Sequence, residues 1–184
     1  MANPADIQHL IGDLAREGVV VSVDPAAGTA RVRFNDDLTT GDIPWLASRA
    51  GKTRTWSPPS VGEQVAVLAP KADTARGIII GSLSSDAYPH PANDASTLIE
   101  YEDGARIGYD PVAHALTAIL PGGATVRIDA DGGLSLKGDV TVDGDIRSTG
   151  TITADTDVIG AGKSLKDHVH LGVQPGGAVS GKPQ

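Results

Sequence analysis

The stretch GVVVSVDPAAGTARVRF, residues 18–34, carries the clearest fold signal in the chain. Two valine-rich runs, 19–24 and 30–34, flank a PAAG turn, a pattern typical of a β-hairpin whose strands bury one face. Three further runs of the same kind follow, and each predicts a strand: DIPWLA (42–47), EQVAVLAP (63–70) and RGIIIGSL (76–83). The sequence therefore predicts five strands between residues 18 and 85.

Five short strands with turns between them suit a small Greek-key barrel of the oligonucleotide/oligosaccharide-binding (OB) type. Side chains of this region partly match the version of the barrel that binds single-stranded nucleic acid: Arg31, Arg33, Arg49, Lys52, Arg54, Trp45 and Trp56. Acidic neighbours dilute the match, and the chain carries a net charge of −8, with 15 basic against 23 acidic residues. A nucleic-acid binder needs a basic face, so we expect no nucleic-acid partner.

The residues before the barrel predict one short helix over 1–17. Four apolar side chains fall at the spacing of a single helical stripe: Ile7, Leu10, Ile11 and Leu14. Asn3 or Asp6 could cap this helix, and Gly18 could end it. The helix either packs on its own domain or docks and trimerises the chain. No secretory signal is recognisable at the N-terminus, so we expect synthesis and assembly in a cytoplasm.

The character of the chain changes after a linker at residues 86–96. Fifteen of the 23 glycines lie beyond residue 95, and Asp-Gly, Gly-Gly or Asp-Pro pairs punctuate the sequence every six to ten residues. These pairs mark tight turns. The runs between them predict very short strands, each with one apolar side: 97–104, 105–111, 114–123, 124–132, 133–138, 139–144, 145–150, 151–156 and 157–160.

Strands this short cannot build a core alone and must bury their apolar side against neighbours. A single-chain β-helix, an ordinary β-sandwich or three intertwined chains would each provide that cover. No aromatic residue follows Tyr109, which favours a thin three-walled prism filled by Val, Ile and Leu. The fold class expected is therefore mainly β: a helix and an OB-fold-like barrel (18–85), then an intertwined trimeric β-helix (97–160) and an apex (161–184).

The predicted apex contains the run SLKDHVHLGV, residues 164–173. In an extended strand His168 and His170 point to the same side, so three chains around an axis would supply six imidazoles. Octahedral nitrogen ligation suits Fe(II), Ni(II) or Co(II) better than Zn(II), and it leaves no open position for catalysis. The alternative is a solvated pair in a tail.

Other candidate chemistry is sparse. The chain has no cysteine, no phosphate-binding glycine loop and no nucleophile elbow. The acids Asp103, Asp131, Asp143 and Asp145 lie in predicted turns and are interpreted as turn formers. We therefore expect no enzyme. The alternative function is a trimeric β-helical adhesin that binds host-surface glycan, although a shaft without aromatic residues counts against it.

The order of these parts resembles the baseplate assembly protein V family, the central spike of contractile-tailed bacteriophages. The likeness rests on the barrel runs, on the Asp/Gly-punctuated strands and above all on the ending SLKDHVHLGVQPGGAVSGKPQ, residues 164–184. It implies a homotrimer in the tail baseplate of the virion, with the N-terminal part under the tail tube and hub. The apex would pierce the host outer membrane when the tail contracts. The linker leaves no room for the lysozyme domain of some related spikes.

The resemblance also implies a metal and its ligands. One iron ion per trimer would be held by six histidines, which are His168 and His170 of each chain. The site would be structural. A calcium or chloride ion on the axis of the shaft stays unassigned.

Overall fold

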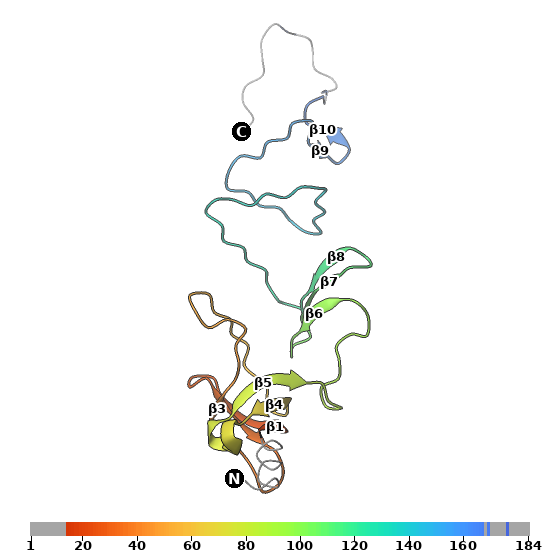
Figure 1. Cartoon of the computed structure of the whole chain (residues 1–184). Helices are drawn as coiled ribbons and strands as arrows, with labels where there is room; N and C mark the ends of the chain where they lie inside the picture. The colour runs from red at the N-terminus through yellow and green to blue at the C-terminus, as the bar shows by residue number, and fades with distance from the viewer. Residues whose placement is uncertain (1–13, 168, 170–175, 177–184) are drawn as a thin grey trace, which may run out of the picture. The chain divides into compact units, whose positions relative to one another are not determined.

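The computed structural model describes residues 14–167, 169 and 176 (Figure 1). It divides into two compact units, Met1–Arg127 and Ile128–Gln184, and this division falls inside the stretch expected to form the shaft. Most of the helix expected over residues 1–17 lies outside the described residues. Within the part of the chain that is described, no helix has the length and apolar character needed to cross a bilayer.

Five strands of the first unit form one curled antiparallel sheet in the order β3-β2-β1-β4-β5 (Figure 1). The strands are β1 (Ala15–Asp24), β2 (Thr29–Arg33), β3 (Ile43–Pro44), β4 (Gln64–Leu68) and β5 (Ile78–Leu83). Each lies within or across one of the five runs expected to form strands, so that prediction is confirmed. The first strand begins earlier than expected, because Ala15 already pairs with Leu68 of β4.

The two edge strands of this sheet meet each other. Trp45, just after β3, forms a parallel bridge with Ile79 of β5, and the Leu46 amide donates to the Ile79 carbonyl at 2.8 Å. Register shifts between Val20 and Ser22, and between Ala66 and Val67, add the curvature that such closure requires. The curled sheet is consistent with the expected OB type.

The interior of the curled sheet is built from small aliphatic side chains. Its buried members are Val20, Ala30, Val32, Ile43, Val65, Val67 and Ile79, with Val23, Phe34 and Trp45 packed against them. Burying one Val or Ile side chain is worth about 1.5–3 kcal/mol, so this cluster supplies the unit's main stabilisation. The one buried polar residue here, Thr40, is satisfied, because its hydroxyl accepts from the Val32 amide at 2.9 Å.

The hairpin between β1 and β2 shows why the PAAG turn works. The Asp24 carboxylate accepts from the amides of Ala26 and Ala27 at 3.0 and 3.1 Å. Gly28 closes the turn at a φ of 68° and donates to the Asp24 carbonyl at 2.9 Å. A left-handed residue at this point favours glycine, so the turn fixes the register of the hairpin.

The linker that follows β5 is tied to the barrel by Tyr88. Its hydroxyl donates to the Val61 carbonyl at 3.2 Å. Its ring lies over Gly62, where an added Cβ would come within 3.3 Å of the Tyr88 hydroxyl oxygen at a φ of +91°. The expected linker therefore has a fixed point on the barrel within this unit.

A second antiparallel sheet in this unit is a three-stranded meander, ordered β6-β7-β8. Its strands are β6 (Thr97–Glu100), β7 (Arg106–Asp110) and β8 (Ala115–Ile119). They lie within the first three short runs expected after the linker. Asp103 and Asp110 form the two turns, since each carboxylate accepts backbone amides of the residues that follow it.

The second unit contains one hairpin of described strands, β9 (Ile159–Gly160) and β10 (Lys163–Ser164). Between β8 and β9 the described backbone forms no strand, although the sequence predicts five short ones at 124–156. Two local turns are closed there, by Ala124 donating to Pro121 and Gly133 donating to Ala130. A single chain thus supplies no strand partner for this stretch.

Candidate assembly surface and apex

The meander β6–β8 carries an apolar face that its own chain leaves exposed. The register places Thr97 opposite Tyr109 and Leu116, and Ile99 opposite Ile107 and Ala118. Because alternate residues of a strand share a face, these side chains form one surface. We name it the apolar face: Ile99, Ile107, Tyr109, Leu116 and Ala118. Leu116, in the edge strand β8, is 80% exposed.

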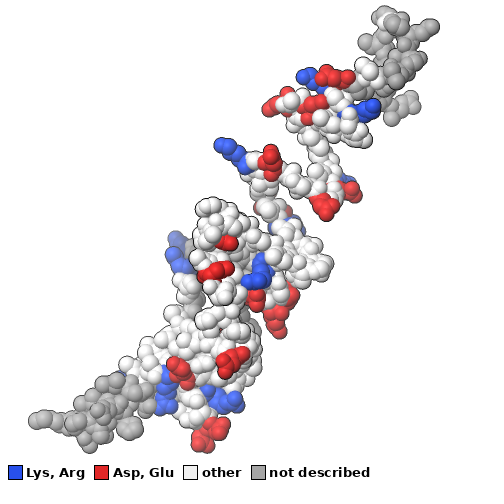
Figure 2. Space-filling view, turned by 90° about the vertical axis from the view of Figure 1, so that its right-hand side faces the viewer, with Lys and Arg blue, Asp and Glu red and all other residues white. Residues whose placement is uncertain are grey.

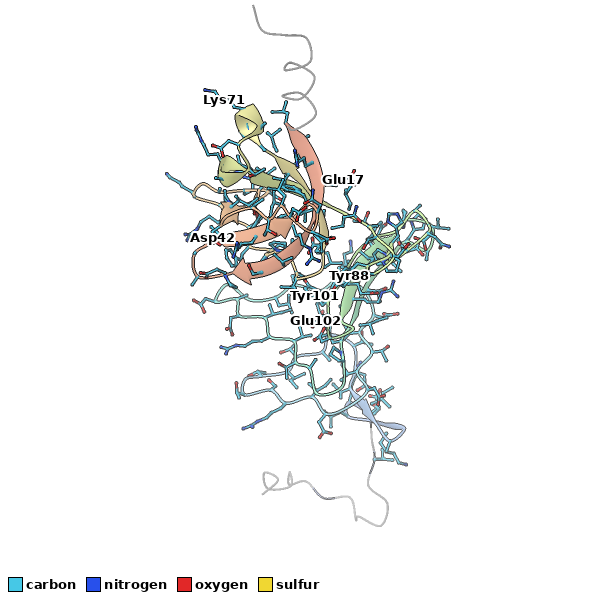
Figure 3. The ribbon with its side chains drawn as sticks, turned by 90° about the horizontal axis from the view of Figure 1, so that it is seen from below. Glu17, Asp42, Lys71, Tyr88, Tyr101 and Glu102 are labelled. Carbon is cyan, nitrogen blue, oxygen red and sulfur yellow. The ribbon has the colours of Figure 1, made fainter. Side chains whose placement is uncertain are left out.

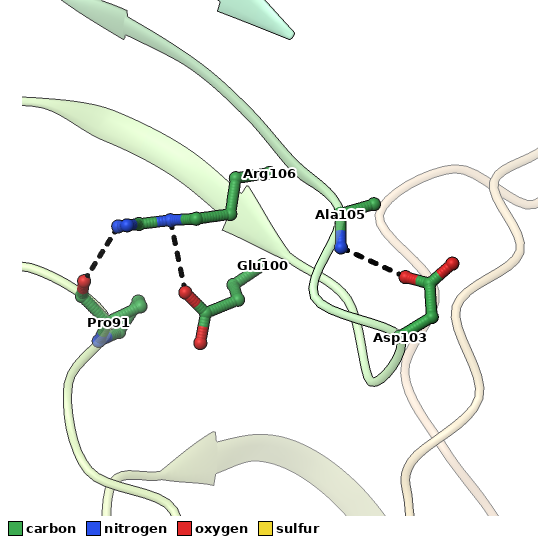
Figure 4. A network of polar contacts seen from close by, with 5 residues as sticks. All are labelled: Pro91, Glu100, Asp103, Ala105 and Arg106. Carbon is green, nitrogen blue, oxygen red and sulfur yellow. Dashed lines mark hydrogen bonds and ion pairs between the residues drawn. The ribbon is translucent and has the colours of Figure 1, made fainter. Parts of the chain in front are cut away.

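The opposite face of the meander is occupied by a polar network (Figure 4). The Arg106 guanidinium pairs with Glu100 at 3.0 Å and donates to the Pro91 carbonyl at 3.1 Å. Both charged side chains are almost half exposed, so the pair adds little stability by itself. This face is mixed, because Ile119, which is 59% exposed, lies beside Arg106 on it, whereas the apolar face carries no charged side chain.

Apolar side chains are exposed in the second unit as well. Large aliphatic side chains there are between 47% and 74% exposed: Ile128, Leu134, Leu136, Val140, Val142, Ile146, Ile152 and Val158. Several are two residues apart, as in Leu134 and Leu136, so they would share one side of an extended strand. Monomeric soluble proteins rarely expose contiguous apolar patches of this kind.

The predicted metal ligands His168 and His170 lie outside the described residues. Among the residues that are described, no three of the side chains His, Cys, Asp and Glu lie close enough to hold a metal ion. What the structure provides is the support directly before the histidines. The hairpin β9–β10 turns at Ala161 and Gly162, with φ values of 49° and 75°, a tight two-residue turn.

Asp157 organises that support. Its carboxylate accepts from the amide of Val158 at 2.8 Å and from the amide of Lys166 at 3.2 Å, nine residues along the chain. The Leu165 amide donates to the Val158 carbonyl at 2.8 Å, which closes the same loop. The hydrogen bond from the Ser164 side chain, followed by those of the backbone amides, lowers the pKa of Asp157 against the opposing effect of burial. The sequence analysis missed this residue.

Comparison with known proteins agrees with this layout. Residues 16–83 match the family model of the type VI secretion system and phage-baseplate injector OB domain, which covers β1 to β5. The spike protein of Escherichia phage P2 is 35% identical to this chain over 136 residues, which are 73% of the chain and 63% of that protein. Residues 16–83 are therefore similar to this injector OB domain, and the chain is similar to a phage spike protein.

The matched OB domain and the similarity to the P2 spike protein support the predicted resemblance to the baseplate spike family. The chain spans less than two thirds of the length of the P2 protein, at 63%. The matched OB domain coincides with the described barrel, whose expected boundaries were 18–85.

Three of the residues that partly matched a nucleic-acid site, Trp45, Trp56 and Arg31, have other partners in this chain. Trp45 packs against the barrel core, and Trp56 meets it edge to face, with ring centroids 5.4 Å apart. Arg31 donates through Nε to the Thr40 carbonyl at 3.2 Å. On the face drawn in Figure 2, acidic and basic side chains are interspersed, without a continuous basic field. This arrangement does not form a stacking platform inside a basic groove.

Replacing Asp157 with Asn tests its role in the loop before the histidines. Because the pKa of Asp157 is lowered in the folded hairpin, its contribution is complete above about pH 3.8, the ordinary value, and is lost as the pH falls through the lower pKa. At neutral pH, Asp157→Asn should therefore speed amide exchange of residues 158–167 several-fold, measured by hydrogen exchange with mass spectrometry.

Asp155→Asn is the matched control, since Asp155 is exposed and makes no hydrogen bond or ion pair with any described residue. It should leave the exchange unchanged. Equal protection in wild type and Asp157→Asn at neutral pH would contradict the role given to Asp157.

Proposed function

We propose that this chain is the central spike of a contractile phage tail baseplate, assembled as a homotrimer whose apex pierces the host outer membrane on contraction. The observation that carries the proposal is the set of apolar side chains left exposed from the apolar face through Val158. The similarity to the P2 spike protein supports the role in the baseplate. The virion, in its tail baseplate, is then where the chain acts, after assembly in the host cytoplasm.

Trimerisation would cover the exposed apolar side chains. Removing apolar surface from water is worth about 25 cal/mol per Å², and three copies around one axis would bring three apolar faces together. The same association would give the residues 124–156 strand partners from neighbouring chains. Backbone amides and carbonyls that have no partner in their own chain would then be paired.

Iron at the apex is proposed from the family resemblance, and the donor set fits it. His168 and His170 offer two imidazoles per chain, and six imidazoles from three chains suit a six-coordinate ion such as Fe(II). Their neutral side chains bind the ion, which when bound supplies a crosslink among the three chains. Metal binding is linked to folding, so the crosslink would hold the C-terminal ends, which otherwise fray first. No catalytic step is proposed.

Contacts with the tail tube, hub and baseplate proteins are proposed for the N-terminal part, which contains the barrel. The outer membrane is the proposed contact of the apex. A calcium or chloride ion on the shaft axis stays unassigned.

A charge placed on the apolar face tests the trimer. Leu116→Asp should lower the fraction of trimer strongly, because the carboxylate would be buried between chains without a partner. Val112→Asp should leave the trimer intact. The two sites are matched in a single chain, where Leu116 is 80% and Val112 81% exposed, but Val112 lies in the turn between β7 and β8 and not on the apolar face.

The measurement is the molar mass in solution by light scattering, compared with the 18.7 kDa of one chain. A wild-type mass of one chain would refute the trimer. Equal behaviour of Leu116→Asp and Val112→Asp would show that the apolar face is not the contact.

The metal is tested by elemental analysis of the purified protein. We expect one iron per three chains, and its loss in both His168→Ala and His170→Ala, because each removes three of six ligands. His114→Ala is the control, since His114 lies in the turn between β7 and β8. A trimer that keeps its iron in either apex variant would contradict the ligand assignment.

A further inference from the structure

The loop between β3 and β4 forms a basic projection in an acidic protein. Residues 46–60 carry three cations, Arg49, Lys52 and Arg54, and no acid, whereas the whole chain has a net charge of −8. All three cations are exposed. Across the described residues, no carboxylate lies within ion-pair distance of any of them. We name residues 46–60 the basic loop.

The basic loop has a defined structure. Its tip is a small hairpin, in which Ala50 bridges Arg54 and the Thr55 amide donates to the Arg49 carbonyl at 3.0 Å. Its returning limb is fixed at both ends, because Trp56 packs on Trp45 and the Ser60 amide donates to Glu63 at 2.7 Å. The three charges are therefore held outward on a tethered support, which lowers the entropy cost of binding a partner.

An acidic turn lies beside the basic loop in the same unit. Glu100 ends β6, and the turn that follows it contains Glu102 and Asp103. Glu100 is already paired with Arg106, and Asp103 uses one oxygen to accept from the Ala105 amide at 3.0 Å. Glu102 makes no hydrogen bond or ion pair with any described residue, and Figure 3 shows it next to Tyr101 in this turn. We name residues 100–103 the acidic turn.

The basic loop and the acidic turn line one cleft without forming an ion pair across it. Ser57, Pro58, Pro59 and Ser60 of the loop line it together with Glu100, Tyr101 and Glu102 of the turn. The returning limb of the loop and the acidic turn are therefore neighbours within the unit, whereas Arg49, Lys52 and Arg54 at the loop tip do not line this cleft.

We propose that in the trimer the basic loop of each chain docks on the acidic turn of the neighbouring chain. The occupant is a second copy of this chain, selected by charge complementarity between the cations of the loop and Glu102 and Asp103 of the turn. This inference rests on the proposed trimer, but it makes a separate claim about which surfaces meet. Three such contacts would form a ring of ion pairs where the barrel gives way to the shaft.

Cross-linking identifies the contact directly. A zero-length carbodiimide reagent joins an amine to a carboxylate that lie in contact, so the wild-type chain should yield covalent dimers and trimers. Peptide mass spectrometry should locate a link between Lys52 and Glu102. Lys52→Gln should abolish this link, and Lys71→Gln should retain it, because Lys71 lies on a different part of the unit, well away from Glu102 (Figure 3).

Charge reversal is the second test of the proposed contact. Chains with Arg49→Glu, Lys52→Glu and Arg54→Glu should assemble at least about tenfold more slowly at low salt, since complementary charges accelerate association. Chains with Glu102→Lys and Asp103→Lys should show the same defect. The chain that combines all five substitutions should recover, because the charges again match, and high salt should reduce every difference.

The outcomes separate the two proposals. A wild-type chain that is monomeric overturns both. A trimer without the Lys52–Glu102 link, or with the link only inside single chains, overturns the docking proposal alone. A trimer whose loop-reversed and combined variants assemble equally slowly also overturns it, and would assign the basic loop to an acidic surface of another protein.

Discussion

A β-strand needs neighbouring strands for its hydrogen bonds, and the described residues between β8 and β9 find none within their own chain. From β6 onward, apolar side chains line one side of short extended runs, but no layer of the same chain covers them. An unpaired backbone and an exposed aliphatic stripe are both unfavourable in water. The proposed trimer, with its shaft and apex, would pair this backbone and bury this aliphatic stripe at the same time.

The barrel differs from the shaft in this respect. Its core residues, such as Val20, Val65 and Val67, are fully buried, and its edge strands meet through Trp45 and Ile79. A unit that satisfies its own core can fold on local contacts and then act as a platform. Tyr88 fixes the start of the linker to this platform by bonding to the Val61 carbonyl. The barrel can therefore fold before the shaft strands find their partners in other chains.

The sequence was sufficient where one chain determines the structure. Alternation and turn residues predicted all five barrel strands, and the Asp-Gly pattern predicted β6, β7 and β8. The carboxylate of Asp157 was not recognised, because its contact with Lys166 spans nine residues and has no periodic signal. The basic loop was noticed as a charge pattern, but its tethering by Trp56 and Trp45 depends on the closed barrel.

Other features could not be settled from one chain for a physical reason. The strands expected at 124–156 stay predictions, because their hydrogen-bond partners would belong to neighbouring copies. The pair His168 and His170 also stays a prediction, since two imidazoles become a six-ligand site only through threefold symmetry. In both cases one chain supplies only one third of the groups that the proposed trimer needs.

Hydrogen exchange of the full-length protein, measured on residues 124–156 at neutral pH, tests the central claim most directly. If these residues pair between chains, their amides should be protected to a degree comparable with Gln64–Leu68 in the barrel. Exchange as fast as that of an unpaired chain, in protein whose barrel amides remain protected, would contradict the account.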